Sequence, residues 1–480
     1  MLESPNEAAK SGPKLPVVYC QYPLEYLALL KQNQRYRLYF LSHICQHIGD
    51  WYIRIASLLA MDRLAPHSAT AISILVLVKL GPHALFPTLG GALADSLDRR
   101  KLMMTLDILG AVVTFGFMIA IETNSLVLFY VIAALRATVH SLYEPTTKAL
   151  VPMIVADHED LKRAMTLNGL AWAFLMAIGG IVAGATSSYI GLQACFAFDS
   201  LTYILSAFVL CLLRGNYKVP NDGQTLARNN DPSDVVKNKT VRSILLSMTR
   251  PFVAFTRMTC EVIKYLWRSG FGLVVFLKST GSIIWGPTDV LNMEYAHVAD
   301  DEAATSERLG IMFSCLGAGC LVGPMFANFF TDPDRPASLQ LVCIGAIAFM
   351  MTGWIGFSET SSFSLICFFS FVRGCGSSVI WVNSSLLLQR LSVPEMLGRV
   401  LALEFAFMML FESIMAYGTG ILVDKGITKH EISTAVAAIA AGFFLVWSTY
   451  HMFGRGAARK EFNQSSPEVR QDTVANVVFA

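Results

Sequence analysis

The stretch Gly90–Lys101 reads GGALADSLDRRK and separates two long apolar segments. The apolar residues Ile72–Leu89 before it and Leu102–Ile121 after it are each about long enough to cross a bilayer as a helix. Glycines at a helix end allow a neighbouring helix to approach closely, an aspartate accepts hydrogen bonds from a helix N-terminus, and arginines favour the cytoplasmic face. The stretch therefore predicts a short cytoplasmic loop between two membrane helices.

The rest of the chain repeats this alternation of apolar segments and short polar loops. Hydrophobic residues make up 54% of the 480 residues and charged residues only 15%, which excludes the surface of a soluble protein. Six segments precede a polar interruption and six follow it: Leu38–Leu59, Ile72–Leu89, Leu102–Ile121, Leu126–Tyr143, Ala164–Ser187, Leu192–Leu213, Phe271–Met293, Leu309–Phe330, Leu339–Phe357, Phe363–Leu387, Val400–Leu422 and Ile432–Met452. We predict an all-α membrane protein with 12 transmembrane helices in two six-helix halves.

The positions of lysine and arginine predict the orientation, because cytoplasmic loops accumulate these residues. They gather on one alternating set of loops, which includes Arg99, Arg100 and the polar region from Arg214 to Arg268. Both termini are therefore expected in the cytoplasm. The predicted organisation is a tail over 1–34, an N-terminal half over 35–213, a linker with a basic interfacial helix over 214–270, a C-terminal half over 271–453 and a second tail over 454–480.

Charge balance and missing motifs exclude several classes of function. The 37 Lys and Arg against 35 Asp and Glu leave a net charge of +2, which gives no indication of nucleic-acid binding. The 10 cysteines form no CxxC pair, so they predict neither a disulfide framework nor a metal site. The sequence has no GxSxG, HExxH or phosphate-binding glycine loop. We therefore expect no enzymatic activity and no cofactor.

Ionisable side chains inside the apolar segments are the candidate functional residues, because each costs about 2.5–3.5 kcal/mol at the bilayer centre. The first segment places His43, Gln46, His47, Asp50 and Arg54 on one face of a helix. Asp50 then has two interpretations. It is a carboxylate that carries a coupling proton or contacts substrate, or it forms a permanent i,i+4 ion pair with Arg54.

The fourth segment repeats this pattern with Arg136 and His140 one turn apart on one face. Packed across the bundle, Arg136 would hold Asp50 in its charged form and release it when the two halves rock. The alternative is a static latch between the two side chains. We assign Asp50, Arg54 and Arg136 to proton coupling or to a structural ion pair.

Polar residues in the second half extend the candidate site. Lys278 precedes Trp285-Gly286-Pro287, which would loosen the helix beside an aromatic wall. The alternative is that these residues serve close helix packing and that Lys278 snorkels toward water. The residues predicted to line a substrate cavity are His43, Gln46, His47, His140, Lys278, Trp285, Arg373, Trp381, Asn383 and Glu412.

Three motifs resemble those of a known family. Two sets of six apolar segments, with a Gly91-xxx-Asp95-xxx-Arg99-Arg100 loop after the second, resemble the major facilitator superfamily. Within it, Ile48-Gly49-Asp50-Trp51 and Pro394-Glu395-Met396-Leu397-Gly398-Arg399-Val400 are similar to signatures of proton-linked drug antiporters and enterobactin-exporter-like proteins. Ser96 and Asp98 depart from the usual loop, which has Arg or Lys and often Gly there. The resemblance implies a monomer whose cytoplasmic gating loop contains Gly91, Asp95, Arg99 and Arg100.

The expected function is secondary active transport. We expect a proton-coupled exporter of a small amphipathic or chelating organic molecule, working by alternating access in the plasma membrane. Its partners would be this substrate, protons and the lipid bilayer. One alternative is a lysophospholipid translocator, because similar exporters share the Leu97-Asp98-Arg99-Arg100 form of the loop. Another is a non-transporting membrane sensor with the same fold, although the presence of Asp95 and Arg99 favours a transporter.

Overall fold

The computed structural model describes residues 23–66, 68–155, 157–218, 262–269, 271–299 and 301–464. Helices joined by short turns make up these ranges, and no strand occurs within them. The all-α prediction is therefore confirmed. Most of the predicted linker and most of both predicted tails lie outside the described residues.

The N-terminal bundle, α1–α8, contains the first six predicted segments. Its helices are α1 (Pro23–Gln32), α2 (Gln34–Leu64), α3 (Ala69–Leu85), α4 (Pro87–Ser96), α5 (Arg99–Glu122), α6 (Leu126–Ile154), α7 (His158–Tyr189) and α8 (Leu192–Leu212).

The C-terminal bundle, η2–α16, contains the other six. It consists of the 3₁₀ helix η2 (Gly272–Val275) and the α-helices α10 (Phe276–Trp285), α11 (Thr288–Ala296), α12 (Glu302–Ala327), α13 (Pro336–Glu359), α14 (Phe363–Leu391), α15 (Pro394–Asp424) and α16 (Lys429–Gln464). Residues 262–268 form a further short helix, of which Val262, Tyr265 and Leu266 are buried. The earlier part of the predicted interfacial helix lies outside the described ranges.

Polar residues at the helix starts explain where several helices begin. The side chains of Asn33, Ser68, Asp98, Ser125 and Asp301 each accept a hydrogen bond from a backbone N–H in the first turn of α2, α3, α5, α6 and α12. Each of these bonds satisfies one of the N–H groups that a helix start leaves without an intrahelical partner. The helix starts are therefore set by local sequence.

Two of the predicted segments are broken helices. Proline has no N–H and clashes with the preceding turn, so Pro87 ends α3 and begins α4, and Pro287 separates α10 from α11. At the second break, a side chain on Gly286 would contact the backbone of Glu412 at 2.9 Å and Met415 Cβ at 2.7 Å. Gly286 therefore both accompanies the break and allows close packing of α15.

All twelve predicted segments are helical. Among the described residues, nine helices are long and apolar enough to cross a membrane, and they match nine of these segments. The other three are the polar helix α2 and the interrupted pairs α3–α4 and α10–α11. These exceptions carry many of the ionisable side chains discussed below.

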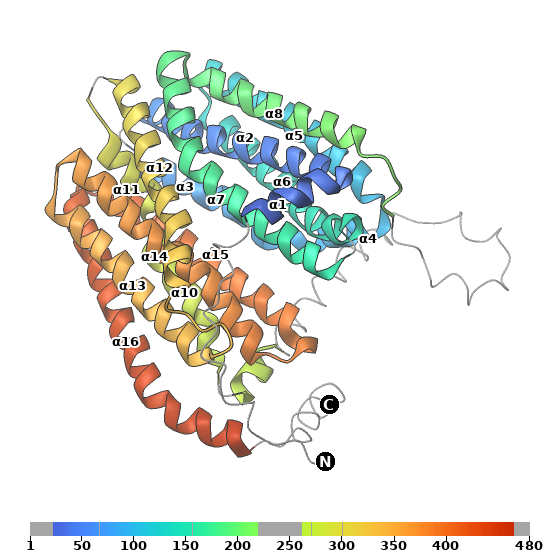
Figure 1. The fold of residues 1–480 in the computed structure, drawn as a ribbon. Helices are drawn as coiled ribbons and strands as arrows, with labels where there is room; N and C mark the ends of the chain where they lie inside the picture. Colours follow the sequence, from blue (N-terminus) through green and yellow to red (C-terminus); the bar gives the residue numbers. More distant parts are fainter. Residues whose placement is uncertain are drawn as a thin grey trace, which may run out of the picture.

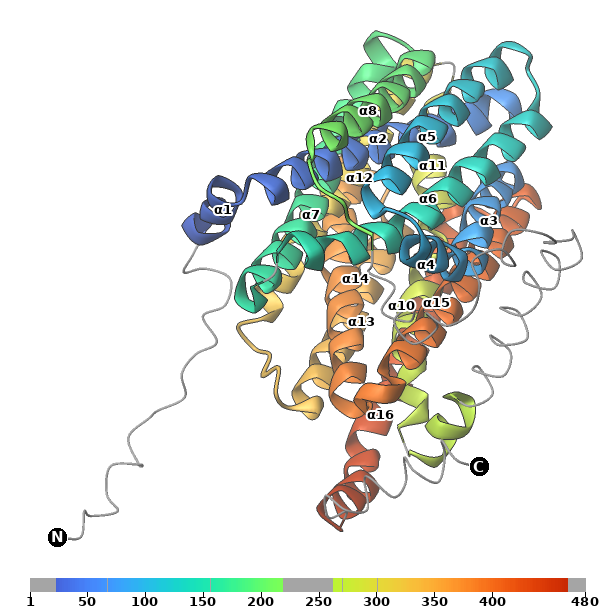
Figure 2. The same ribbon diagram turned by 90° about the vertical axis from the view of Figure 1, so that its right-hand side faces the viewer.

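The two bundles contact one another mainly at one end of the molecule. We call this the closed end; it contains the end of α2 and the starts of α3 and α12. Its opposite, the linker end, is where the described chain leaves at Lys218 and resumes at residue 262. In Figures 1 and 2 the bundles converge at the closed end and diverge toward α4 and the start of α10. Within the described ranges, every hydrogen bond or ion pair that joins the bundles lies at the closed end or near mid-length.

Small residues allow α7 and α12 to approach closely at this end. A side chain on Gly310 would contact the carbonyl oxygen of Gly180 at 2.5 Å and the Cα of Gly184 at 3.0 Å. The Ser306 hydroxyl donates to the Gly184 carbonyl at 2.9 Å. In membranes, where helix association has little hydrophobic driving force, such close backbone contact contributes to packing.

Candidate functional site

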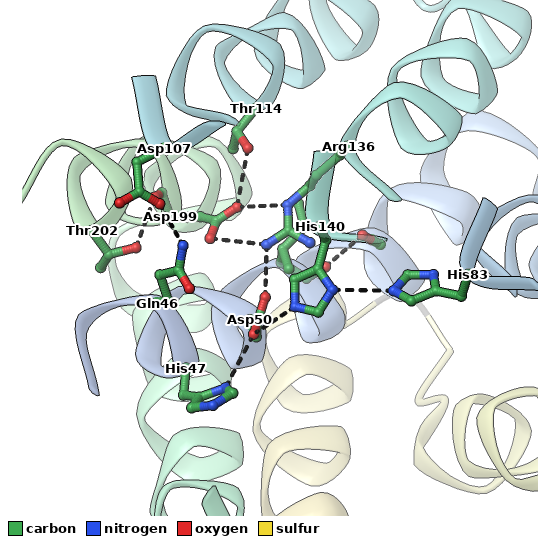
Figure 3. A network of polar contacts seen from close by, with 12 residues as sticks. Gln46, His47, Asp50, His83, Asp107, Thr114, Arg136, His140, Asp199 and Thr202 are labelled. Atoms are coloured by element: carbon green, nitrogen blue, oxygen red, sulfur yellow. Dashed lines mark hydrogen bonds and ion pairs between the residues drawn. The ribbon is translucent and has the colours of Figure 1, made fainter. Parts of the chain in front are cut away.

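The centre of the N-terminal bundle contains one arginine between two aspartates (Figure 3). Arg136 of α6 donates to Asp50 of α2 at 3.0 Å and to Asp199 of α8 at 3.1 and 3.2 Å. The Asp199 side chain is 1% exposed, whereas that of Asp50 is 28% exposed. The guanidinium therefore balances one fixed, enclosed carboxylate and one accessible carboxylate. The predicted contact between Arg136 and Asp50 across the bundle is present.

Histidines extend this network on both sides of Asp50. His47 Nδ1 lies 3.3 Å from Asp50, and its Nε2 lies 3.1 Å from His43 Nε2. On the other side, His140 Nε2 lies 3.8 Å from Asp50 and its Nδ1 lies 3.1 Å from His83 Nε2. These contacts form a continuous series of ionisable groups around Asp50, most of which is labelled in Figure 3. Three of the predicted cavity residues thus belong to the network of Asp50.

Gln46 does not belong to this series, although the sequence placed it on the same face of α2. Its amide donates to Asp107 of α5, whose carboxylate also accepts from Ser206 of α8 at 2.7 Å. Asp107 and Gln46 are both buried. Gln46 therefore lies inside the N-terminal bundle, because the polar face of α2 is wide enough to reach both the centre of the bundle and α5.

The i,i+4 ion pair between Asp50 and Arg54, one of the two interpretations of Asp50, is not present in the structure. Arg54 donates to Asp289 of α11, in the other bundle, at 2.6 Å. Its guanidinium also lies 5.8 and 5.2 Å from the ring centroids of Trp51 and Phe313, distances at which cation–π attraction operates. One further turn along α2 moves the side chain from the bundle interior to the interface, so Arg54 joins the two bundles.

In the C-terminal bundle, Lys278 is held by its own ion pair. Its ammonium donates to Glu404 of α15 at 2.9 Å and also contacts the Ser385 hydroxyl. Both charged side chains are buried. Lys278 also lies 5.1 Å from the ring centroid of Trp381, a residue that is 51% exposed. The pair satisfies Lys278 locally, so snorkelling toward water is not needed.

The other predicted cavity residues of this bundle occupy different environments. Arg373 is buried, donates to Asn292 at 3.1 Å and stacks on Trp354. Asn383 is buried too and donates to a backbone carbonyl of its own helix. Trp285, at the end of α10, is partly buried against the core. In this conformation Arg373 and Asn383 therefore face the bundle interior.

Two charged side chains near the interface have no direct partner. Glu412 of α15 and Lys79 of α3 make no hydrogen bond or ion pair with their side chains in the described part of the chain. Both interact electrostatically with Arg54 and Asp289. They are thus close to the ion pair that joins the bundles.

The loop that follows α4 is held by its arginines and by Asp98. Arg99 donates to the carbonyl of Ala149 at 2.7 Å, and Arg100 donates to two carbonyls at the end of α8. Asp98 accepts from the backbone of Lys101 and of residue 217. The loop therefore fastens α5 to α6 and α8, while the side chain of Asp95 lies outside the described structure.

Close approach at this loop involves only the first of its two glycines. A side chain on Gly90 would meet the backbone of Leu142 at 3.0 Å, whereas one on Gly91 would meet nothing within 4 Å. Gly90 thus allows α4 to pack against α6. Gly91 has no packing requirement of this kind.

Sequence reasoning missed five charged or ionisable residues of the site, although each is a polar residue within a helix of apolar character. These residues are Lys79, His83, Asp107, Asp199 and Asp289. The cost of a charge in the bilayer would have identified them as candidates. Within the described ranges, no three His, Cys, Asp or Glu side chains gather closely enough to hold a metal ion.

Long apolar helices in two bundles, with ionisable side chains gathered between and within them, define an integral multi-pass membrane protein of the transporter class. The sequence model of the Major Facilitator Superfamily matches residues 39–299. The chain belongs to this superfamily.

Several relatives are transporters, and some are named for efflux. The chain is 22% identical to the uncharacterized MFS-type transporter YkuC of Bacillus subtilis, over 71% of this chain and 74% of that protein. It is also 22% identical to macrolide efflux protein A of Streptococcus pyogenes, over 76% and 83%. A putative bacilysin exporter, BacE of Bacillus subtilis, is 24% identical over 39% of this chain and 46% of its own length. These relatives agree with the predicted drug-efflux-like branch.

Solved structures show the same fold. A POT family transporter in complex with 5-aminolevulinic acid matches with a TM-score of 0.64 and 11% identity, over 87% of this chain and 96% of that chain. A bacterial homologue of the iron transporter ferroportin in an inward-facing state matches with a TM-score of 0.61 and 14% identity, over 86% and 98%. At such identities the likeness concerns the fold alone.

Proposed function

We propose that this protein is a proton-coupled exporter of a small amphipathic or chelating organic molecule, with Asp50 as the residue that carries the coupling proton. The main observation that supports this proposal is the position of Arg136 between Asp50 and Asp199. One guanidinium faces two carboxylates, so these three side chains together carry one net negative charge. A proton at Asp50 would neutralise that charge.

Exposure and position favour Asp50 over Asp199 as the proton carrier. Asp199 is enclosed and also accepts from Thr114 at 3.2 Å, so its role is to hold Arg136 in place. Asp50 is more accessible and contacts the imidazole rings of His47 and His140, which can donate and accept hydrogen bonds. Protonation of Asp50 would weaken its hold on Arg136 and allow α2 to move relative to α6.

Contacts between the bundles support alternating access. The two bundles meet at the closed end and diverge at the linker end, where the loops rich in lysine and arginine lie. If these loops are cytoplasmic, the described conformation is open toward the cytoplasm, as an exporter requires for loading. The names of the efflux-type relatives support export as the direction.

The test is proton flux in liposomes that contain purified protein and a trapped pH dye. We would add erythromycin, ethidium and an alanyl-tyrosine dipeptide separately and compare wild type with Asp50→Asn. Substrate-dependent proton flux in wild type that Asp50→Asn abolishes, with exchange of labelled substrate retained, would support the proposal. Flux that survives Asp50→Asn would refute it.

A matched control comes from the same bundle. Asp107 is also a buried carboxylate of the N-terminal bundle, but its partners Gln46 and Ser206 are neutral. Asp107→Asn therefore removes a buried acid without altering the arrangement around Arg136. We expect this variant to keep substrate-dependent proton flux, and loss of flux in both variants would indicate a structural effect.

A further inference from the structure

Lys79 and Glu412 are two ionisable side chains of opposite charge that lie on opposite bundles and have no direct partner in the described part of the chain. Within the described residues, neither side chain forms a hydrogen bond or ion pair. An isolated charge in the membrane interior costs several kcal/mol, so charges at that depth are paired or functional. The neighbouring Arg54 and Asp289 form an ion pair with each other. Lys79 and Glu412 therefore remain as the charged side chains with which a ligand can pair.

Helix geometry places both residues at a similar depth. α3 and α15 pack against each other at the closed end, where Asp424 accepts from the backbone N–H of Ala69 at 2.7 Å. Lys79 is ten residues into α3 and Glu412 is twelve residues before the end of α15. At 1.5 Å per residue these positions are about 15 and 18 Å from the closed end, near the middle of a bilayer.

Two shared neighbours place both side chains near the interface. Each interacts electrostatically with Asp289 and with Arg54, which are bonded to one another across the bundles. Lys79 and Glu412 nevertheless do not pair with each other. A ligand between the bundles at this depth would therefore meet a free ammonium on one side and a free carboxylate on the other.

We infer that the exported molecule is a zwitterion, whose anionic group binds Lys79 and whose cationic group binds Glu412. This inference rests on the proposed export function and adds the class of substrate. Because the two residues belong to different bundles, a zwitterion would bridge the bundles, while a molecule with one charge would bind only one of them. Two sources share this chemistry: a small amino-acid-like or peptide-like molecule, and a zwitterionic lysophospholipid headgroup.

The experiment measures thermal stabilisation of the purified full chain in detergent by matched probes. The soluble probes are the dipeptide alanyl-tyrosine, its N-acetyl form with only the carboxylate and its amide with only the amine. The lipid probes are lysophosphatidylethanolamine and the singly charged lysophosphatidylglycerol. We expect one of the two zwitterions to bind at least about tenfold more tightly than its singly charged analogues, because each charged contact contributes about 1.5–3 kcal/mol. Which zwitterion binds distinguishes the two sources.

Two variants test the assignment of each charge. Lys79→Gln should abolish the preference for the dipeptide over its amide. Glu412→Gln should abolish the preference for the dipeptide over its N-acetyl form, or for lysophosphatidylethanolamine over lysophosphatidylglycerol. Equal binding of zwitterions and singly charged analogues by wild type would overturn the inference, as would wild-type preferences in the double variant or binding of neither zwitterion. Retained preference in a single variant would overturn the assignment of that residue.

Binding and coupling can fail separately. Equilibrium binding in detergent needs no proton gradient, so a failure of proton flux in liposomes leaves this result unchanged. Asp332→Asn serves as a matched control, since Asp332 pairs with Arg335 at the surface of the C-terminal bundle, away from the interface.

Discussion

Replacing Asp289 with asparagine should open the closed end of the molecule. The side chain accepts from Arg54 at 2.6 Å, and these two residues are 18% and 34% exposed. Breaking a fully buried ion pair costs about 3–5 kcal/mol, whereas exposed pairs contribute about 0–1 kcal/mol. Because this pair is partly exposed, its loss should destabilise the closed conformation relative to the open one by about 2 kcal/mol. This corresponds to about a 30-fold change in the ratio of closed to open conformations.

Distances between two spin labels would measure this change. Glu122 at the end of α5 and Ser361 before α14 are exposed at the closed end on opposite bundles. Labels there, in a background without the ten native cysteines, would report the separation of the bundles. If the open form makes up about 1% of wild type, Asp289→Asn should raise it to about one quarter.

Two controls separate this effect from general destabilisation. Asp334→Asn removes an ion pair with Arg390 that is similarly short, at 2.8 Å, but lies within the C-terminal bundle at the linker end. It should leave the label distances unchanged. Exchanging the charges with Arg54→Asp and Asp289→Arg should restore the closed form in part. An unchanged distance distribution in Asp289→Asn would refute the view that this pair holds the bundles together.

Three further changes test the packing and the structural ion pairs. Gly310→Leu should push α12 away from Gly180 and disfavour closure, so that a cysteine placed at the closed end reacts faster with a water-soluble maleimide. Lys278→Met should lower the free energy of unfolding of the purified protein by about 3 kcal/mol, because it leaves Glu404 buried without its cation. Adding Glu404→Leu should recover most of that loss. Asp98→Ala removes the N-terminal cap of α5 and should lower the free energy of unfolding by about 1 kcal/mol, measured by unfolding of the purified protein. Asp98→Asn should retain part of the stability that the cap contributes.

The helices could be predicted from sequence because each apolar segment specifies its own length. The breaks at Pro87 and Pro287 follow from local chemistry as well, and the sequence motif at Trp285 indicated the second one. Periodicity also placed His43, His47 and Asp50 on one face of α2. These features depend on neighbours within a few residues.

Partners across the bundle could not be predicted in this way. The i,i+4 spacing of Asp50 and Arg54 favours a pair within α2, but the packed structure gives each a different partner on another helix. Asp199 and Asp289 stand as lone acids in their segments, and nothing in their spacing indicates which cation they meet. Choosing among such partners requires the order and tilt of the helices, which hydrophobic periodicity does not contain.

The single turn of α2 between Asp50 and Arg54 links two kinds of contact. Asp50 belongs to the network inside the N-terminal bundle, and Arg54 belongs to the pair that joins the bundles. Four residues along a helix correspond to a rise of about 6 Å, and a helix transmits a rotation over that distance with little loss because its backbone is hydrogen-bonded throughout. A change in the hold of Arg136 on Asp50 would therefore also shift Arg54 relative to Asp289. If Asp50 carries the proton, this connection would make closure of the bundles depend on its charge.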